Sequence, residues 1–180
     1  MVELKETSPC ADVLPVQIGS LSIEEVAFEP MTSLSAFGDA SALAKALEAA
    51  HGVNWPAPGE TSSNGNVRCI WFGHGEALLT GVQPAAELAN HGAVVDQSDA
   101  WVVVDLHGVG AVDVLARVTP LDFRQGVFAV GQTARSQIVH MSASITKIEE
   151  NRFRLMVFRS MAHTLVHDLK QAMAAVASRR

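Results

Sequence analysis

The stretch with the clearest potential for chemistry is a glycine-bearing turn between an apolar strand and a short amphipathic helix. Residues 101–110 read WVVVDLHGVG, and a helix is expected over 111–118. A dinucleotide-binding loop has this order, but its third glycine position needs a small residue so that the helix and a pyrophosphate can approach. Asp113 stands there instead, and its carboxylate would repel a phosphate. The pattern therefore favours a plain tight turn over a nucleotide-binding enzyme.

Two histidines, His163 and His167, have the i, i+4 spacing with which one helix face can chelate a metal ion. A zinc-protease motif would place a glutamate directly after the first histidine, where this chain has Thr164, and no third ligand is evident. The other histidines lie near the ends of expected elements, and none is flanked by serine or cysteine in a nucleophile motif. We therefore assign no metal ligand and no catalytic residue.

The remaining candidates point to a partner surface. Arg159 precedes Ser160, the expected N-cap of the last helix, and a cation is unfavourable at that end of a helix dipole. An acidic partner would explain it, and so would a solvated arginine. From polarity and placement, the candidate interface residues are Trp101, Arg124, Arg159 and His163.

Composition limits the classes of function. The chain has 180 residues, 48% of them hydrophobic, which is enough to bury a core in one domain or in two small halves. Its formal net charge of -6 provides no attraction for nucleic acid or for an anionic membrane surface. Cys10 and Cys69 form no Cys-x-x-Cys motif, and no apolar run is long enough for a membrane span. We expect a cytoplasmic protein that binds neither nucleic acid nor membrane.

The pattern along the chain indicates an irregular N-terminal arm over residues 1–30 and one domain over 31–180, with halves at about 31–92 and 93–180. Three prolines interrupt the arm, at positions 9, 15 and 30. In the first half a helix is expected over 39–50, with Asp39 as its N-cap.

The second half shows the period of strands more clearly. Strands are expected over 93–97 and 101–107, joined as a hairpin, then over 133–148 and 152–158, with helices at 111–118 and after Ser160. Leu165, Leu169 and Met173 share one face of that last helix. Paired strands alternating with single helices predict an α+β fold, with helices packed on mostly antiparallel sheets and two related halves.

Residues 36–176 resemble a known family in three places. These are DQSDAWVVVDLHGVGAVDVLARVTPLDF (96–123), FAVGQT (128–133) and FRLMVFRSMAHTLVHDL (153–169), with a looser match at RCIWFGHGEALLT (68–80). Their order and spacing are similar to those of the gamma subunit of heterotetrameric sarcosine oxidase. That family is related to the folate-binding domain of the glycine-cleavage T-protein, so the resemblance implies an aminomethyltransferase-like, folate-binding-domain-like fold in which the glycines make a turn.

The resemblance implies a non-catalytic, structural subunit that packs with alpha, beta and delta subunits in a heterotetramer. Such a complex oxidatively demethylates sarcosine to glycine with tetrahydrofolate as the one-carbon acceptor, and the isolated gamma chain is expected to be inactive. FAD, FMN, NAD and tetrahydrofolate are expected in the other subunits, with no cofactor bound by this chain.

One departure from the related aminomethyltransferases bears on chemistry. Those enzymes carry an aspartate in the strand region that corresponds to residues 140–148, which here read HMSASITKI without a carboxylate. Folate binding is therefore not carried over to this chain. Two alternatives stay open: a gamma-like subunit of a related complex such as N-methylglutamate dehydrogenase, and a free-standing folate-binding module or small aminomethyltransferase-like protein.

Overall fold

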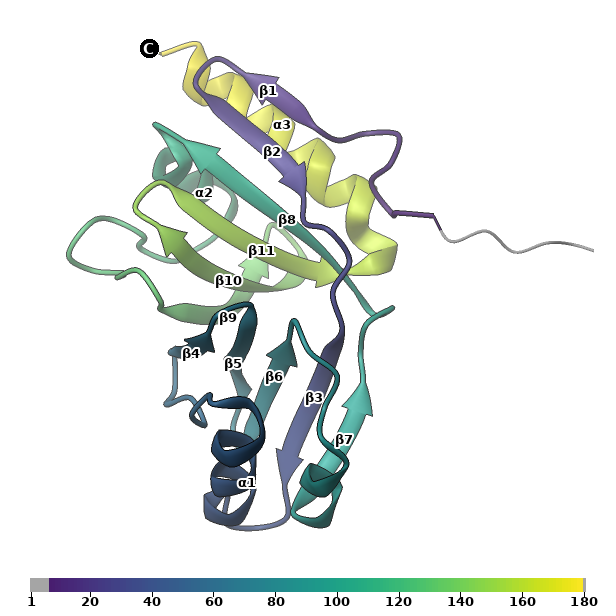
Figure 1. The fold of residues 1–180 in the computed structure, drawn as a ribbon. Coiled ribbons are helices and arrows are strands. Elements are labelled where there is room, and N and C mark those ends of the chain that lie inside the picture. Colours follow the sequence, from purple (N-terminus) through teal and green to yellow (C-terminus); the bar gives the residue numbers. More distant parts are fainter. Residues whose placement is uncertain (1–6, 180) are drawn as a thin grey trace, which may run out of the picture.

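The computed structural model describes residues 7–179 and consists of two antiparallel sheets with helices on their outer faces (Figure 1). The elements in chain order are β1 (Val16–Ile18), β2 (Leu21–Glu25), β3 (Met31–Ala36), α1 (Ser41–His51), β4 (Thr61–Asn64), β5 (Val67–Gly73), β6 (Glu76–Thr80), the 3₁₀ helix η1 (Ala86–Asn90), β7 (Gly92–Asp96), β8 (Trp101–Gly108), α2 (Ala111–Val118), β9 (Thr133–Ile138), β10 (Met141–Glu149), β11 (Arg152–Phe158), the 3₁₀ helix η2 (Arg159–Met161) and α3 (Ala162–Ala177).

The larger sheet has the strand order β1-β2-β8-β11-β10-β9, and every neighbouring pair is antiparallel. Alternate residues of β8 point to opposite faces, so Val102, Val104 and Leu106 lie together on one face. They pack with the buried residues of α2 and α3, which cover this face (Figure 1). The apolar stripe on α3 includes Leu165 and Leu169, both fully buried.

The smaller sheet has the strand order β4-β5-β6-β3-β7. Its outer face packs against Leu43 and Leu47 of α1 and Leu88 of η1. Cys69 of β5 is fully buried in this cluster, as its apolar surroundings in the sequence predict. Helix α1 ends at Gly52, whose φ of 67° gives the left-handed conformation that glycine adopts most easily.

A third apolar cluster joins the inner faces of the two sheets. Its buried members are Met31, Ile70 and Leu78 from the smaller sheet and Trp101, Val103 and Met156 from the larger one. Strand β8 therefore has buried side chains on both faces, which explains its nearly continuous apolar sequence.

The predicted α+β class with antiparallel sheets is confirmed, but three predictions about the organisation of the chain differ from the structure. Within the arm predicted to be irregular, residues 16–25 form the β1–β2 hairpin, and β2 pairs with β8; residues 1–6 lie outside the described residues. The strand at 92–96 pairs with β3 of the smaller sheet and not with β8. From β3 onward the chain passes from the smaller to the larger sheet between residues 96 and 101, later than the predicted boundary at 92/93, while β1 and β2 already belong to the larger sheet.

Two other local predictions differ from the structure. The stretch 133–148 is two strands joined by a turn, where Val139 has a φ of 54°. The last helix begins at Ala162 because Ser160 lies in η2, and no side chain caps α3. Helix α1 likewise has Ala40 at its N-cap, although the carboxylate of Asp39 accepts hydrogen bonds from Ser41.

Candidate partner-binding cleft

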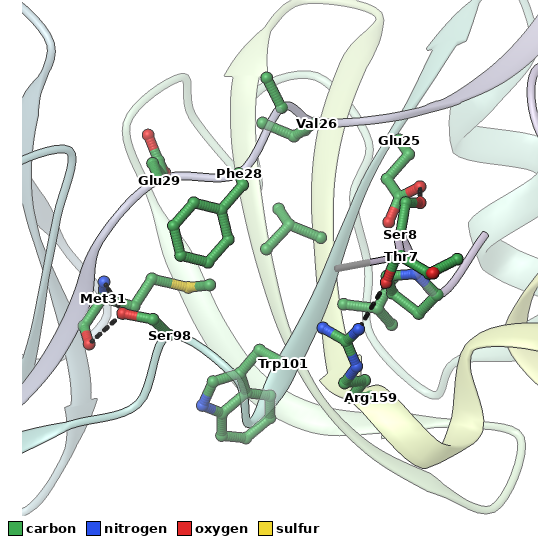
Figure 2. A pocket seen from close by; sticks show the side chains of 14 residues that line it. Thr7, Ser8, Glu25, Val26, Phe28, Glu29, Met31, Ser98, Trp101 and Arg159 are labelled. Atoms are coloured by element: carbon green, nitrogen blue, oxygen red, sulfur yellow. Dashed lines mark hydrogen bonds between the residues drawn. The ribbon is translucent and has the colours of Figure 1, made fainter. Parts of the chain in front are cut away.

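A cleft of about 230 Å³ lies beside the segment that leads from β2 to β3, and Figure 2 shows the side chains around it. Phe28 lines it from this segment, Met31 from the start of β3 and Trp101 from the start of β8. Arg159 and the N-terminal residues 7–9 complete the rim. The structure thus brings together two of the four candidate interface residues, Trp101 and Arg159, because the start of β8 pairs with the end of β11.

Trp101 is mainly a packing residue between the two sheets. It is 6% exposed, stacks on Phe158 with ring centroids 4.6 Å apart, and meets the edge of Phe72 at 5.3 Å. The guanidinium of Arg135 lies 4.2 Å from the centroid of the Phe72 ring. Only the edge of Trp101 that lines the cleft is therefore open to a partner.

Arg159 has partners within its own chain. Its Nη2 donates to the Thr7 carbonyl oxygen at 2.7 Å, as Figure 2 shows, and its backbone N–H donates to the carbonyl of Ala100. The carboxylate of Asp99 lies 3.9 Å from Nη1 and is almost fully exposed. The position of this cation before α3 is thus explained by contacts that tie the N-terminal segment to the start of β8 and α3.

Exposed aromatic side chains mark the cleft more clearly than the predicted residues do. Phe28 is 64% exposed, and in Figure 2 its ring stands at the centre of the cleft. Phe158 does not line the cleft, but it is 48% exposed and stacks on Trp101, which does. Exposed apolar side chains that gather at one place are typical of protein-binding surfaces. Sequence reasoning missed Phe28. The one feature that could have indicated it was an aromatic residue two positions before Pro30.

The other two candidates lie outside the cleft. Arg124 is in the loop after α2, and its guanidinium binds both carboxylate oxygens of Asp122. These hydrogen bonds lower the pKa of Asp122 to about 2. His163 is exposed in the first turn of α3. Both remain predictions for a partner surface.

The glycine turn after β8 has the geometry of a turn only. Gly108 has a φ of 117°, and a Cβ atom there would lie 2.0 Å from the carbonyl oxygen of Ser20. The strand before it has antiparallel neighbours on both sides, so it does not open a parallel βαβ unit. Both findings agree with the preference for a tight turn over a nucleotide loop.

The described residues hold no group of three or more histidine, cysteine or acidic side chains placed to bind a metal ion. The ring of His167 instead contacts the side-chain amide of Gln171 at 2.7 Å. Among the helices of residues 7–179, none has the length and apolar character needed to cross a membrane.

A buried ionic cluster lies on the inner face of the larger sheet. Asp105 is fully buried in β8, and its carboxylate accepts from Arg152 at 2.7 Å and from Arg154 at 3.0 Å. Both arginines lie on the neighbouring strand β11. In the sequence, this cluster is visible only as an aspartate in one apolar strand and two arginines spaced i, i+2 in another. The register of β8 with β11 is what places these arginines beside Asp105.

Comparisons with known proteins agree with this architecture. A family described as "Sarcosine oxidase, gamma subunit family" matches residues 35–175. The sarcosine oxidase subunit gamma of Corynebacterium sp. (strain U-96) is 28% identical over 165 residues, covering 86% of this chain and 80% of the relative.

Among solved structures, a chain of the heterotetrameric sarcosine oxidase from Corynebacterium sp. U-96, in complex with pyrrole 2-carboxylate, superposes with a TM-score of 0.83 and 26% identity over 96% of both chains. The aminomethyltransferase T of the glycine cleavage system from Bartonella henselae shares the fold, with a TM-score of 0.57 at 14% identity over 84% of this chain and 45% of the enzyme. With its fold and most of its length matched, this chain belongs to the sarcosine oxidase gamma subunit family.

Proposed function

We propose that this chain is the gamma subunit of a heterotetrameric sarcosine oxidase and that it contributes structure to the complex. The observation that carries this proposal is the superposition on a chain of the Corynebacterium enzyme over 96% of both chains, at a TM-score of 0.83. Its partners would be the alpha, beta and delta subunits. FAD, FMN, NAD and tetrahydrofolate would be held by those subunits, and the assembled enzyme would convert sarcosine to glycine in the cytoplasm.

The side chains on β10 support a non-catalytic role. Residues 140–148 carry no carboxylate, and the inner face of β10 presents the hydroxyls of Ser144 and Thr146 at positions paired with Met156 and Arg154. A serine or threonine hydroxyl without an adjacent base is a poor proton-transfer group. We therefore expect the isolated chain to oxidise no amine.

The cleft around Phe28 is the proposed contact with a partner subunit, and the contact would bury Phe28 and the exposed side of Phe158. Aromatic anchors of this kind carry much of the binding energy at protein interfaces. Arg124 and His163 would lie at the edge of the same interface or at a second one.

Co-expression of the tagged chain with the alpha, beta and delta chains tests the subunit proposal. We expect one complex on size exclusion that contains all four chains and oxidises sarcosine. If the tagged chain elutes alone while its partner chains are soluble, the subunit proposal is wrong. A complex that oxidises N-methylglutamate in place of sarcosine would support the related dehydrogenase instead.

A pair of matched variants tests the position of the interface. Phe28→Ser removes the ring in the cleft, whereas Phe37→Ser removes an equally exposed ring, 68% exposed, directly after β3. We expect Phe28→Ser to weaken assembly at least about tenfold and Phe37→Ser to leave it unchanged. Equal effects of the two variants would contradict the proposed interface.

The free-standing folate-binding alternative has its own measurement. The fold similarity to aminomethyltransferase T at 14% identity concerns the architecture alone. Titration of the isolated chain with tetrahydrofolate should give no saturable binding. Stoichiometric binding would favour the folate-binding module over the structural subunit.

A further inference from the structure

A second cavity, of about 150 Å³, opens between the two sheets at their β4, β5, β10 and β11 strands. Two arginines line it, Arg68 from β5 and Arg154 from β11, and no acidic residue does. Three hydroxyl side chains also line it: Thr61, Ser63 and Thr146. Two guanidinium groups thus meet at one cavity in a chain whose formal net charge is -6.

Arg68 is the unusual member of this group. Among the described residues, no carboxylate oxygen lies within 4.0 Å of its guanidinium, and the side chain is half-buried. It lies on the same face of β5 as Ile70, which is buried against the larger sheet. Burial and the positive charges of Arg154 and Arg152 lower the pKa of Arg68, against the weaker opposite effect of the carboxylates of Glu29 and Asp105. A guanidinium in such a place is stabilised by an anion that it can bind through two N–H groups.

Arg154 has carboxylate partners of its own but keeps one nitrogen without a hydrogen bond among the described residues. Its Nε and Nη2 donate to Asp105, which it shares with Arg152, and Arg152 also has Glu24 and Glu149 within 4.0 Å. Glu29 lies 3.9 Å from Nη1 of Arg154, beyond hydrogen-bond distance. The side chain is 14% exposed, so water reaches only a small part of this guanidinium.

Lys147 borders the cavity but does not add its charge. It pairs with Phe153, while the neighbouring Thr146 pairs with Arg154, so the side chains of Lys147 and Thr146 lie on opposite faces of the sheet. The Lys147 ammonium donates to the carbonyl of Phe128 at 2.8 Å. The cationic groups of the site are therefore Arg68 and Arg154.

We propose that this cavity binds a small free oxyanion, a phosphate or a small carboxylate, between Arg68 and Arg154. Its volume of about 150 Å³ lies below the range of about 300–1,000 Å³ typical of drug-sized ligands and cofactors, so only a small group fits. The hydroxyl of Ser63 is available as a further donor at the rim. The bound anion would pair with Arg68, accept from the Nη1 group of Arg154 and so link β5 of one sheet to β11 of the other.

Calorimetric titration of the full chain with inorganic phosphate and, separately, with acetate tests the proposal at constant ionic strength. We expect saturable binding of one anion per chain for at least one of the two probes. Arg68→Met should weaken that binding about ten- to a hundredfold, because it removes a charge-assisted pair of hydrogen bonds. Arg68→Lys, which keeps the charge but loses the fork geometry, should give a smaller loss.

Arg117→Met is the matched control, since Arg117 is exposed on α2 and lines neither this cavity nor the cleft. The control should bind the anion as the wild type does. Circular dichroism verifies that each variant is folded, and the wild-type titration decides alone if neither Arg68 variant folds. Absence of saturable binding to the wild type, wild-type affinity in folded Arg68→Met, or an equal loss in Arg117→Met would overturn the site.

Discussion

Asp105→Asn removes the negative charge from the buried ionic cluster while preserving the size of the side chain. The carboxylate of Asp105 is fully buried and accepts four hydrogen bonds, two from Arg152 and two from Arg154, at 2.7 to 3.2 Å. The asparagine oxygen can keep part of this bonding, but its amide group meets the guanidinium groups as a second donor. The substitution therefore leaves both guanidinium groups on one neutral acceptor, with only the more distant carboxylates of Glu24, Glu149 and Glu29 as ion-pair partners.

The expected cost follows from how well each arginine can be solvated. Breaking a buried ion pair costs about 3–5 kcal/mol because a charge is left uncompensated. The Arg152 side chain is 34% exposed and has Glu24 at 3.6 Å, whereas the Arg154 side chain is 14% exposed. Since Arg152 retains water and a second carboxylate, the loss should fall at the lower end, about 3 kcal/mol.

Urea unfolding of the isolated chain, followed by tryptophan fluorescence, measures this loss. Asp122→Asn is the matched control, because Asp122 and Arg124 form the same type of pair at an exposed position. That control should change the free energy of unfolding far less than Asp105→Asn does, because water screens an exposed ion pair. If Asp105→Asn costs as little as the control, the buried cluster does not stabilise the fold and the reasoning is refuted.

Further predictions concern the turn after β8 and the two thiols. Gly108→Ala should destabilise the chain by more than about 1–3 kcal/mol in the same urea assay, because φ is positive and the added Cβ meets the Ser20 carbonyl. Gly65→Ala is the control with a positive φ of 59° but open space around it, and it should cost about 1–2 kcal/mol. Equal costs of the two variants would argue against the clash. Burial raises the pKa of Cys10 to about 11 and that of Cys69 to about 12, so neither thiol should react with iodoacetamide in the native chain at pH 8. Unfolding returns both thiols to an ordinary pKa near 9, so their contribution to the free energy of unfolding should be complete below pH 9 and should be lost as the pH rises toward 11 to 12. A free energy of unfolding that stays constant from pH 8 to pH 11 would contradict this.

The elements that sequence reasoning placed well are those with strong local periodicity. The alternation in β8 and the apolar stripe of α3 both follow from residues close together in the chain, and both are buried as expected. The β1–β2 hairpin was missed because its strands are only three and five residues long and lie among prolines. Its pairing with β8 joins residues 79 to 87 positions apart, from Glu25↔Val104 to Leu21↔Gly108, and no local pattern reports such a pairing.

The candidate cleft was predicted only in part for the same reason. Trp101 and Arg159 were selected by polarity and position, and the antiparallel pairing of β8 with β11 brings them to one rim. Phe28 joins them because the connection from β2 to β3 passes over the start of β8, which the sequence of that connection does not reveal. Arg124 pairs with Asp122, only two residues away. The sequence alone nevertheless did not show that the Arg124 guanidinium is bound by this carboxylate.

The sequence by itself determined the α+β class, the family and the turn at Gly108, because periodicity, motif order and glycine positions act over short stretches of chain. The tertiary structure alone decided which strands share a sheet, that β7 belongs to the smaller one, and that Asp105, Arg154 and Arg68 meet between the two sheets. The physical reason is that strand register and the packing of one sheet on another depend on contacts between distant residues, and these contacts form only when the whole chain has folded.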